Sequence, residues 1–218
     1  MIVIKFLTVL PLISLLVNCN HLQRTELVDD RIHIITENVD WSFFQDLDII
    51  HQAIRLRHGV SELYPNETLI TAARHRAVVR AWYENAPPPE EHDNDVAENV
   101  YYQSNPEDAV SAVKVLTNWY VQEEKSYNYE NPIFTPNVQH FVNIVSKTTQ
   151  QYGCGQARSA GQHGGGIYTV CLYSPPYQPG KESENIAKPL FDFKTDQFDF
   201  SMVDDLKVGL VSRLNFRG

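Results

Sequence analysis

Two cysteines, Cys154 and Cys171, have the type and spacing that point most directly to a covalent bond. Each lies in a strand-like segment, residues 152–157 and 167–174, and the turn-rich stretch 161–166 separates the two segments. Counting outward from the middle of that turn places the two cysteines opposite each other, within disulfide reach. A disulfide that closes this loop contributes about 3 kcal/mol in a chain-entropy account.

The third cysteine, Cys19, closes a segment that is typical of a secretory signal peptide. Lys5 is its only charged residue, and residues 6–17 are almost wholly apolar. This run is shorter than the roughly 17–25 apolar residues that a membrane span requires. We therefore expect cleavage to remove residues 1–19 and to leave a secreted, extracellular protein with no transmembrane segment in the mature chain. A signal anchor or a lipidated Cys19 is the alternative.

Composition disfavours several classes of partner. The chain has a formal net charge of −9 and no basic cluster, which argues against nucleic acid and against simple electrostatic attachment to anionic lipid. Its hydrophobic content of 43% is sufficient for one domain with a proper core. Asn66, in the triplet Asn-Glu-Thr, is the only N-glycosylation sequon.

Apolar spacing predicts four helices. One is expected at residues 46–58, where a glycine ends it. A second should begin near Asn66, a good N-cap residue, and a glycan on the same side-chain amide would compete with that role. A third is expected to start near Ser104 and to end near Glu124, and a short fourth helix covers residues 138–147.

The two ends of the chain lack these patterns. Residues 20–45 show no strong period and are interpreted as an N-terminal arm. Residues 46–178 contain the helices and the hairpin and are interpreted as one domain. Residues 179–218 follow a proline-rich stretch and are interpreted as an acidic, phenylalanine-rich C-terminal tail that can dock on a surface.

Six ordered blocks between residues 46 and 176 resemble the CAP superfamily of cysteine-rich secretory proteins, antigen 5 and pathogenesis-related 1 proteins, also called the SCP domain. The blocks are HQAIRLRHGV from His51, AENVY from Ala97, the WY pair at Trp119, QHFVNIVSK from Gln139, YGCG from Tyr152 and YTVCLYSPP from Tyr168. Each block alone is a weak signal, whereas six in the right order form a strong one.

The resemblance implies an α+β fold, an α-β-α sandwich with a small antiparallel sheet between helical layers. It also implies a cleft in which two histidines and two glutamates hold a divalent cation such as zinc in many members. The histidines map to His92 and His140, and one glutamate maps to Glu98. Two histidines are fewer than the three protein ligands usual in catalytic zinc sites, so metal binding would be modest unless a glutamate also binds. Each of these residues has a purely structural role as its alternative.

The second glutamate of the cleft is ambiguous, because the segment contains one extra residue. Counting forward from Trp119 reaches Gln122, whereas counting back from Tyr127 reaches Glu123. We favour Glu123. Another departure from the family pattern, Ser146 in place of a tryptophan, is expected to open a pocket behind His140.

CAP proteins share no single activity, so the resemblance implies a binding role. We predict a secreted, non-catalytic module for a sterol, a fatty-acid-like ligand or an extracellular protein partner, in defence, venom action or immune modulation. The sequence shows no activated serine or cysteine nucleophile. The alternative is a metal-dependent hydrolase that uses His92 and His140, with Glu98 or Glu123 as its base.

Overall fold

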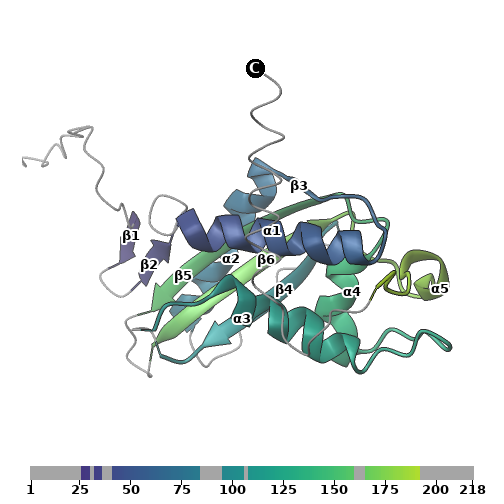
Figure 1. Cartoon of the computed structure of the whole chain (residues 1–218). Coiled ribbons are helices and arrows are strands. Elements are labelled where there is room, and N and C mark those ends of the chain that lie inside the picture. The colour runs from purple at the N-terminus through teal and green to yellow at the C-terminus, as the bar shows by residue number, and fades with distance from the viewer. Residues whose placement is uncertain are drawn as a thin grey trace, which may run out of the picture.

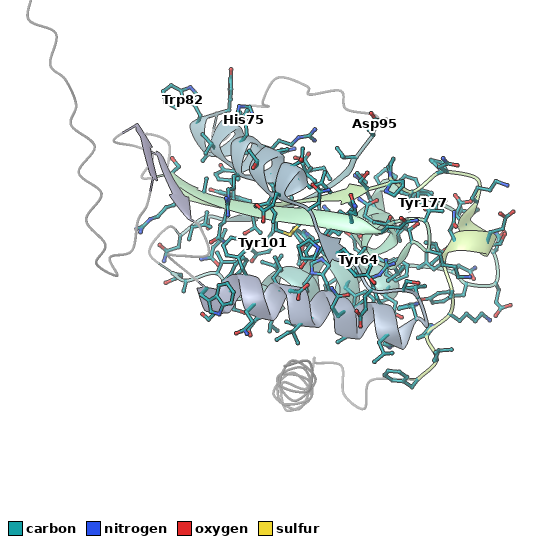
Figure 2. The ribbon with its side chains drawn as sticks, turned by 90° about the horizontal axis from the view of Figure 1, so that it is seen from above. Tyr64, His75, Trp82, Asp95, Tyr101 and Tyr177 are labelled. Carbon is teal, nitrogen blue, oxygen red and sulfur yellow. A yellow bond between two sulfur atoms is a disulfide. The ribbon has the colours of Figure 1, made fainter. Side chains whose placement is uncertain are left out.

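The computed structural model describes residues 26–29, 32–35, 41–83, 95–105, 108–159 and 165–191. In this part of the chain a mainly antiparallel sheet lies between two layers of helices, as Figures 1 and 2 show from two directions. The α+β class and the α-β-α sandwich are therefore confirmed. The expected signal peptide, residues 1–19, and most of the expected tail lie outside the described residues.

The sheet is built around the hairpin that the sequence predicts. Its described strands are β1 (Glu26–Asp29), β2 (Ile32–Ile35), β3 (Tyr64–Pro65), β4 (Ala97–Gln103), β5 (Gln151–Ser159) and β6 (Gly166–Ser174). They lie in the order β1-β2-β5-β6-β4, and the short β3 pairs in parallel with β5. Cys154 lies opposite Cys171 in the register of β5 and β6, as predicted.

Part of the expected N-terminal arm belongs to the sheet and to the first helix. β1 pairs with β2, and β2 extends the sheet by pairing with residues 156–159 of β5. Helix α1 (Trp41–Arg57) begins more than one turn before Asp46, where the spacing places its start. The earlier start of α1 is caused by tertiary packing, because Phe43 is buried and Phe44 packs against the same core.

The helices on one face of the sheet form the main core. There α1 packs with α3 (Ala112–Leu116), the π-helix η1 (Thr117–Gln122), the 3-10 turn η2 (Pro136–Val138) and α4 (Gln139–Val145). Ile50, Trp119, Tyr120 and Phe141 are fully buried in this cluster. The short helix α5 (Glu182–Asn185) follows β6. None of the helices within the described ranges is long and apolar enough to cross a bilayer.

The third helix starts later than the sequence predicts. It begins at Ala112 rather than near Ser104, and Ser111 provides its N-cap. The buried amide of Gln103 donates hydrogen bonds of 3.2 and 2.6 Å to two backbone carbonyls of the loop that follows β4. These bonds hold the loop around the end of the strand, so the chain becomes helical only after it.

Helix α2 (Glu67–Tyr83) covers the other face of the sheet at close range. A Cβ atom at Gly153 would lie 2.2 Å from the backbone N of Ile70, and one at Gly155 would lie 2.3 Å from the backbone N of Arg74. The two glycines of the Gly-Cys-Gly block therefore allow the backbone of α2 to rest directly on β5. Three fully buried alanines of α2 complete this layer, namely Ala73, Ala77 and Ala81.

Asn66 caps α2, as the sequence predicts. Its Oδ1 accepts from the backbone N of Thr68 at 2.9 Å and of Leu69 at 3.2 Å, while its Nδ2 donates to the side chain of Gln151. The cap uses the oxygen, whereas a glycan would be attached to the nitrogen, so the two roles compete less than expected. N-glycosylation of Asn66 stays a prediction.

Candidate functional site

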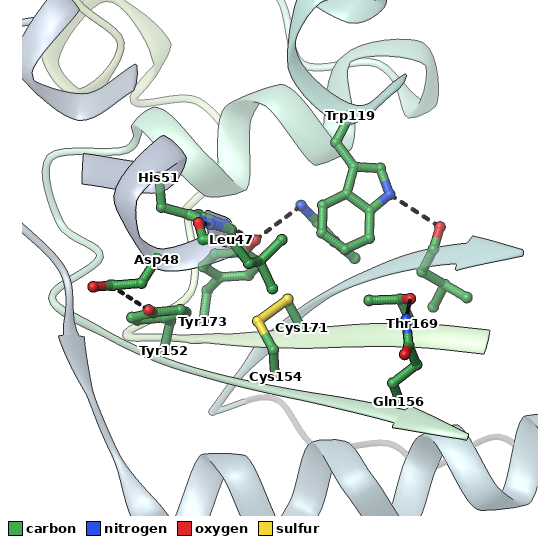
Figure 3. The surroundings of a disulfide bond; sticks show 12 residues. Leu47, Asp48, His51, Trp119, Tyr152, Cys154, Gln156, Thr169, Cys171 and Tyr173 are labelled. Carbon is green, nitrogen blue, oxygen red and sulfur yellow. Dashed lines mark hydrogen bonds between the residues drawn. A yellow bond between two sulfur atoms is a disulfide. The ribbon is translucent and has the colours of Figure 1, made fainter. Parts of the chain in front are cut away.

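The predicted disulfide is present at the centre of the sheet. Cys154 and Cys171 are bonded, their Cα atoms lie 4.1 Å apart, and both residues are buried (Figure 3). Since the two sulfurs are bonded to each other, neither serves as a nucleophile or as a metal ligand. The role of this pair is to tie the two central strands together.

His51 begins a buried polar network beside the disulfide. Its Nδ1 lies 2.7 Å from the carbonyl O of Leu47, and its Nε2 lies 2.8 Å from the hydroxyl of Tyr173 (Figure 3). A carbonyl can only accept, so Nδ1 carries the proton and Nε2 accepts from Tyr173. Burial lowers the pKa of His51 to about 4. His51 is thus a neutral, structural histidine at pH 7.

Two asparagines extend this network to α4. Asn99 of β4 donates through Nδ2 to the carbonyl O of His140 at 3.1 Å, and Asn143 donates to Asn99 Oδ1 at 2.9 Å. Both asparagines are buried. The asparagine of the Ala-Glu-Asn block therefore holds the first turn of α4 in place.

His140 and Glu123, two of the residues that the resemblance maps to a cleft, lie side by side. His140 Nδ1 donates to Glu123 Oε1 at 2.5 Å, and the backbone N of Phe141 donates to Glu123 Oε2 at 2.9 Å. The ring of His140 also stacks on Trp119, with 5.9 Å between the ring centroids. Glu123 therefore fixes the orientation of the imidazole and stabilises the first turn of α4.

The π-helix η1 explains why the two counts of the sequence disagree. Its backbone hydrogen bonds run from residue i to residue i+5, so a turn takes up one more residue than a turn of α-helix. The extra residue lies after Trp119, and the chain then presents Glu123 to His140 while Gln122 is exposed. Counting forward from Trp119 by the family pattern therefore stops one residue early.

Glu98 does not join this pair. Its Oε2 lies 2.6 Å from Arg80 Nη2 and its Oε1 lies 3.9 Å from Arg76 Nη1, and both arginines belong to α2. Neighbouring side chains of a strand point to opposite faces, and the side chain of Asn99 reaches His140. Glu98 therefore faces the α2 layer, away from His140.

The residues that the structure describes fit a metal site only in part. His92 lies outside them, and among them no group of three His, Cys, Asp or Glu side chains is placed to hold a metal ion. His140 and Glu123 alone provide fewer ligands than the three or four usual for zinc. Binding of zinc or another divalent cation stays a prediction.

Arg55, a residue of the first family block, has a structural role. This fully buried side chain donates to four backbone carbonyls, those of Ser61, Ile144, Ser146 and Thr149. Ser146 has no exposed surface, and its hydroxyl lies 2.8 Å from that of Thr148. The pocket predicted at Ser146 therefore does not open to solvent, because hydrogen-bonded backbone occupies this region.

A cavity of about 500 Å³ lies between the first half of α1, the start of α2 and β5. Its lining is Trp41, Phe44, Gln45, Leu47, Asp48, Pro65, Glu67, Ile70, Tyr152, Gly153 and Cys154. At its polar end the Tyr152 hydroxyl donates to Asp48 Oδ1 at 2.5 Å, as Figure 3 shows. Concave sites of this size, mostly apolar with a few polar groups, are typical of small-molecule binding.

Sequence reasoning missed this cavity, since most of its residues lie outside the family blocks. One signal was available: Trp41, Phe44, Gln45 and Asp48 are spaced so that they share one face of a helix. Tyr152 comes from a distant part of the chain, and only the packing of β5 against α1 places it there.

The sandwich, the disulfide across its two central strands and the His140–Glu123 pair define a class of small, disulfide-bonded α-β-α domains. A family model described as the cysteine-rich secretory protein family, CAP, matches residues 50–173, which is more than half of the chain. The chain belongs to this family.

Individual relatives match shorter stretches. Protein PRY2 of Saccharomyces cerevisiae is 40% identical over 55 residues, which cover 25% of this chain and 16% of the relative. The Golgi-associated plant pathogenesis-related protein 1 of Homo sapiens is 33% identical over 79 residues, which cover 35% of this chain and 49% of the relative. The chain thus spans less than half the length of either relative.

Solved structures resemble the chain at low identity. MpPR-1i has a TM-score of 0.49 and 17% identity, and the match covers 65% of this chain and 93% of that one. Venom allergen-like protein 4 of Schistosoma mansoni has a TM-score of 0.46 and 19% identity, with 66% and 93% covered.

Proposed function

We propose that this protein is an extracellular, non-catalytic binding protein that holds the apolar body of a sterol or fatty-acid-like lipid in the cavity beside α1. The observation that carries the proposal is the cavity itself, a concavity of about 500 Å³ with largely apolar walls. A hollow of this shape suits a small molecule better than the flatter surface of a protein partner. The N-terminal segment is predicted to be a signal peptide, and a secreted protein would have access to extracellular lipids.

The apolar residues of the cavity have surface left for a ligand to cover. Trp41 is 65% exposed, and Phe44 and Ile70 are half-buried. Each square ångström of apolar surface removed from water contributes roughly 25 cal/mol. A ligand that covers these three side chains is therefore bound mainly by the hydrophobic effect.

Binding of neutral amphiphiles tests this proposal. We expect cholesterol or hexadecanol to bind saturably at micromolar protein, and Ile70→Trp, which fills the cavity, to weaken that binding by about tenfold or more. Ile133→Trp is the matched control, because Ile133 is exposed and does not line the cavity. Isothermal titration of the three proteins measures the affinities. Absence of saturable binding, or equal affinities in all three, would contradict the proposal.

A second candidate function, weak binding of a divalent cation, is favoured by the orientation of His140. A metal-bound histidine almost always donates its other ring N–H to an acceptor such as a carboxylate, and His140 Nδ1 donates to Glu123. Its Nε2 is thereby left as the ligand atom, with Glu123 as an orienting group. His92 is the further ligand that the resemblance implies. Glu98 is held by Arg80, so of the two bases considered for the hydrolase alternative only Glu123 lies beside His140.

Zinc titration of three variants tests this candidate. We expect about one zinc ion per chain in the natural protein and loss of this binding in both His140→Ala and His92→Ala. His75→Ala is the control, because His75 is exposed on α2, on the other side of the sheet (Figure 2). Calorimetry together with equilibrium dialysis against a fixed zinc concentration gives the stoichiometry. Zinc binding that survives in His140→Ala rules out this site.

A further inference from the structure

The described lining of the cavity carries negative charge only. Asp48 is half-buried on α1, and Glu67 is exposed in the first turn of α2, so the two carboxylates belong to different walls. No lysine, arginine or histidine is found among the cavity's described lining residues. The potential in the cavity is therefore negative, and it favours a positively charged group on a ligand.

Asp48 has one carboxylate oxygen available for a ligand. Tyr152 donates to Oδ1 at 2.5 Å, and Gln52 Nε2 donates to the same oxygen at 3.0 Å. Within the described ranges no hydrogen bond reaches Oδ2. Two donors on one oxygen hold the carboxylate in a single orientation, so Oδ2 is ready to accept a charge-assisted hydrogen bond from a cation.

The edge of β5 adds a backbone donor and acceptor at the same place. The Cα atoms of Cys154 and Cys171 lie 4.1 Å apart, which is the spacing of a non-hydrogen-bonded pair, so the N–H and C=O of Cys154 point away from β6. On that outer edge β3 pairs only as far as Tyr152, and β2 pairs only from Gln156. On this outer edge none of the described strands pairs with Cys154, which lines the cavity.

We propose that the ligand of this cavity is a long-chain amine, with its ammonium group bound by Asp48 and its alkyl chain along the apolar face of α1. The inference rests on the proposed function, because the same cavity must take up the apolar body. A fatty acid would place its carboxylate beside Asp48 and Glu67, and like charges at close range oppose binding. An ammonium group instead donates to Asp48 Oδ2 and to the carbonyl of Cys154, with which no described strand pairs on the outer edge of β5.

Three ligands with the same chain and different head groups test the inference, namely dodecylamine, dodecanol and dodecanoate at pH 7. We expect dodecylamine to bind at least about tenfold more tightly than dodecanoate, with dodecanol between them. Asp48→Asn retains an oxygen for Tyr152 and Gln52 but removes the charge, so it should weaken dodecylamine binding by about tenfold and leave dodecanol unchanged. Calorimetry below the micellar concentration provides the affinities.

A second pair of variants tests the inference even if the Asp48→Asn protein does not fold. Glu67→Gln should weaken dodecylamine binding. Glu62→Gln should not, because Glu62 is also exposed but does not line the cavity. If dodecanoate binds as tightly as dodecylamine, or if neither Asp48→Asn nor Glu67→Gln changes the preference, the amine assignment is wrong while the lipid-binding proposal stands. If none of the three ligands binds while cholesterol or hexadecanol does, the amine assignment fails and the lipid-binding proposal stands. If none of these five ligands binds, both proposals fail.

Discussion

Replacing Arg55 with alanine is expected to lower the free energy of unfolding by about 3–5 kcal/mol. Arg55 is fully buried and donates to four backbone carbonyls, which come from the loop after α1 and from the segment at the end of α4. Without the guanidinium these buried carbonyls lose their partners, and a cavity remains where the side chain was. Burial lowers the pKa of Arg55 to about 10, so the side chain stays charged at neutral pH.

Two further variants separate charge from geometry in this experiment. Arg55→Lys retains the charge but offers one nitrogen in place of the fork, so we expect an intermediate loss of stability. Lys147→Ala removes the same charge from an exposed site and should cost less than about 0.5 kcal/mol. Urea unfolding with linear extrapolation measures all three. An Arg55→Ala protein that is as stable as Lys147→Ala would show that the carbonyl contacts do not matter.

Acidification from pH 6.5 to pH 4 is expected to destabilise the protein by about 3 kcal/mol through His51 alone. Burial lowers the pKa of His51 from 6.5 to about 4. In this window the unfolded chain binds a proton that the folded protein excludes, so stability falls as the pH falls, by up to roughly 1.4 kcal/mol per unit. Well above pH 6.5 both states are neutral at His51, and its contribution no longer depends on pH.

The variant His51→Gln isolates this effect, because it retains one donor and one acceptor but does not titrate. We expect the stability of the natural protein to fall more steeply between pH 6.5 and pH 4 than that of the variant. His58 is also buried with a lowered pKa and titrates in the same direction, so the difference between the two proteins is the relevant quantity. His75→Gln serves as the exposed control. Parallel pH profiles for natural protein and His51→Gln would refute the assignment.

The hairpin and the cap of α2 could be predicted from the sequence, because both depend on residues close together in the chain. The register that joins Cys154 to Cys171 follows from the position of one turn, and the cap at Asn66 follows from one side chain and the three residues after it. Family membership was readable for a different reason: the order of six blocks survives at low overall identity. The hairpin register and the helix cap depend on neighbours in the chain, whereas family membership depends on the order of blocks along it.

The predictions that failed or stayed incomplete depend on distant contacts. The start of α1 is decided by the burial of Phe43, and the orientation of Glu98 is decided by Arg80 on another helix. Glu123 was the favoured residue, but only the π-helix shows how the chain directs it to His140. Spacing rules assume regular helices, so one extra residue defeats them.

The sequence by itself determined the family, the α-β-α class, the disulfide and the candidate pair His140 and Glu123. Only the tertiary structure decided that Glu98 lies apart from this pair, that His51 is a buried neutral histidine, and that a cavity with an acidic end lies beside α1. The physical reason is that a cavity is the space between elements. Asp48 and Tyr152 are distant in the chain, and they meet because α1 and β5 bury their apolar faces against each other.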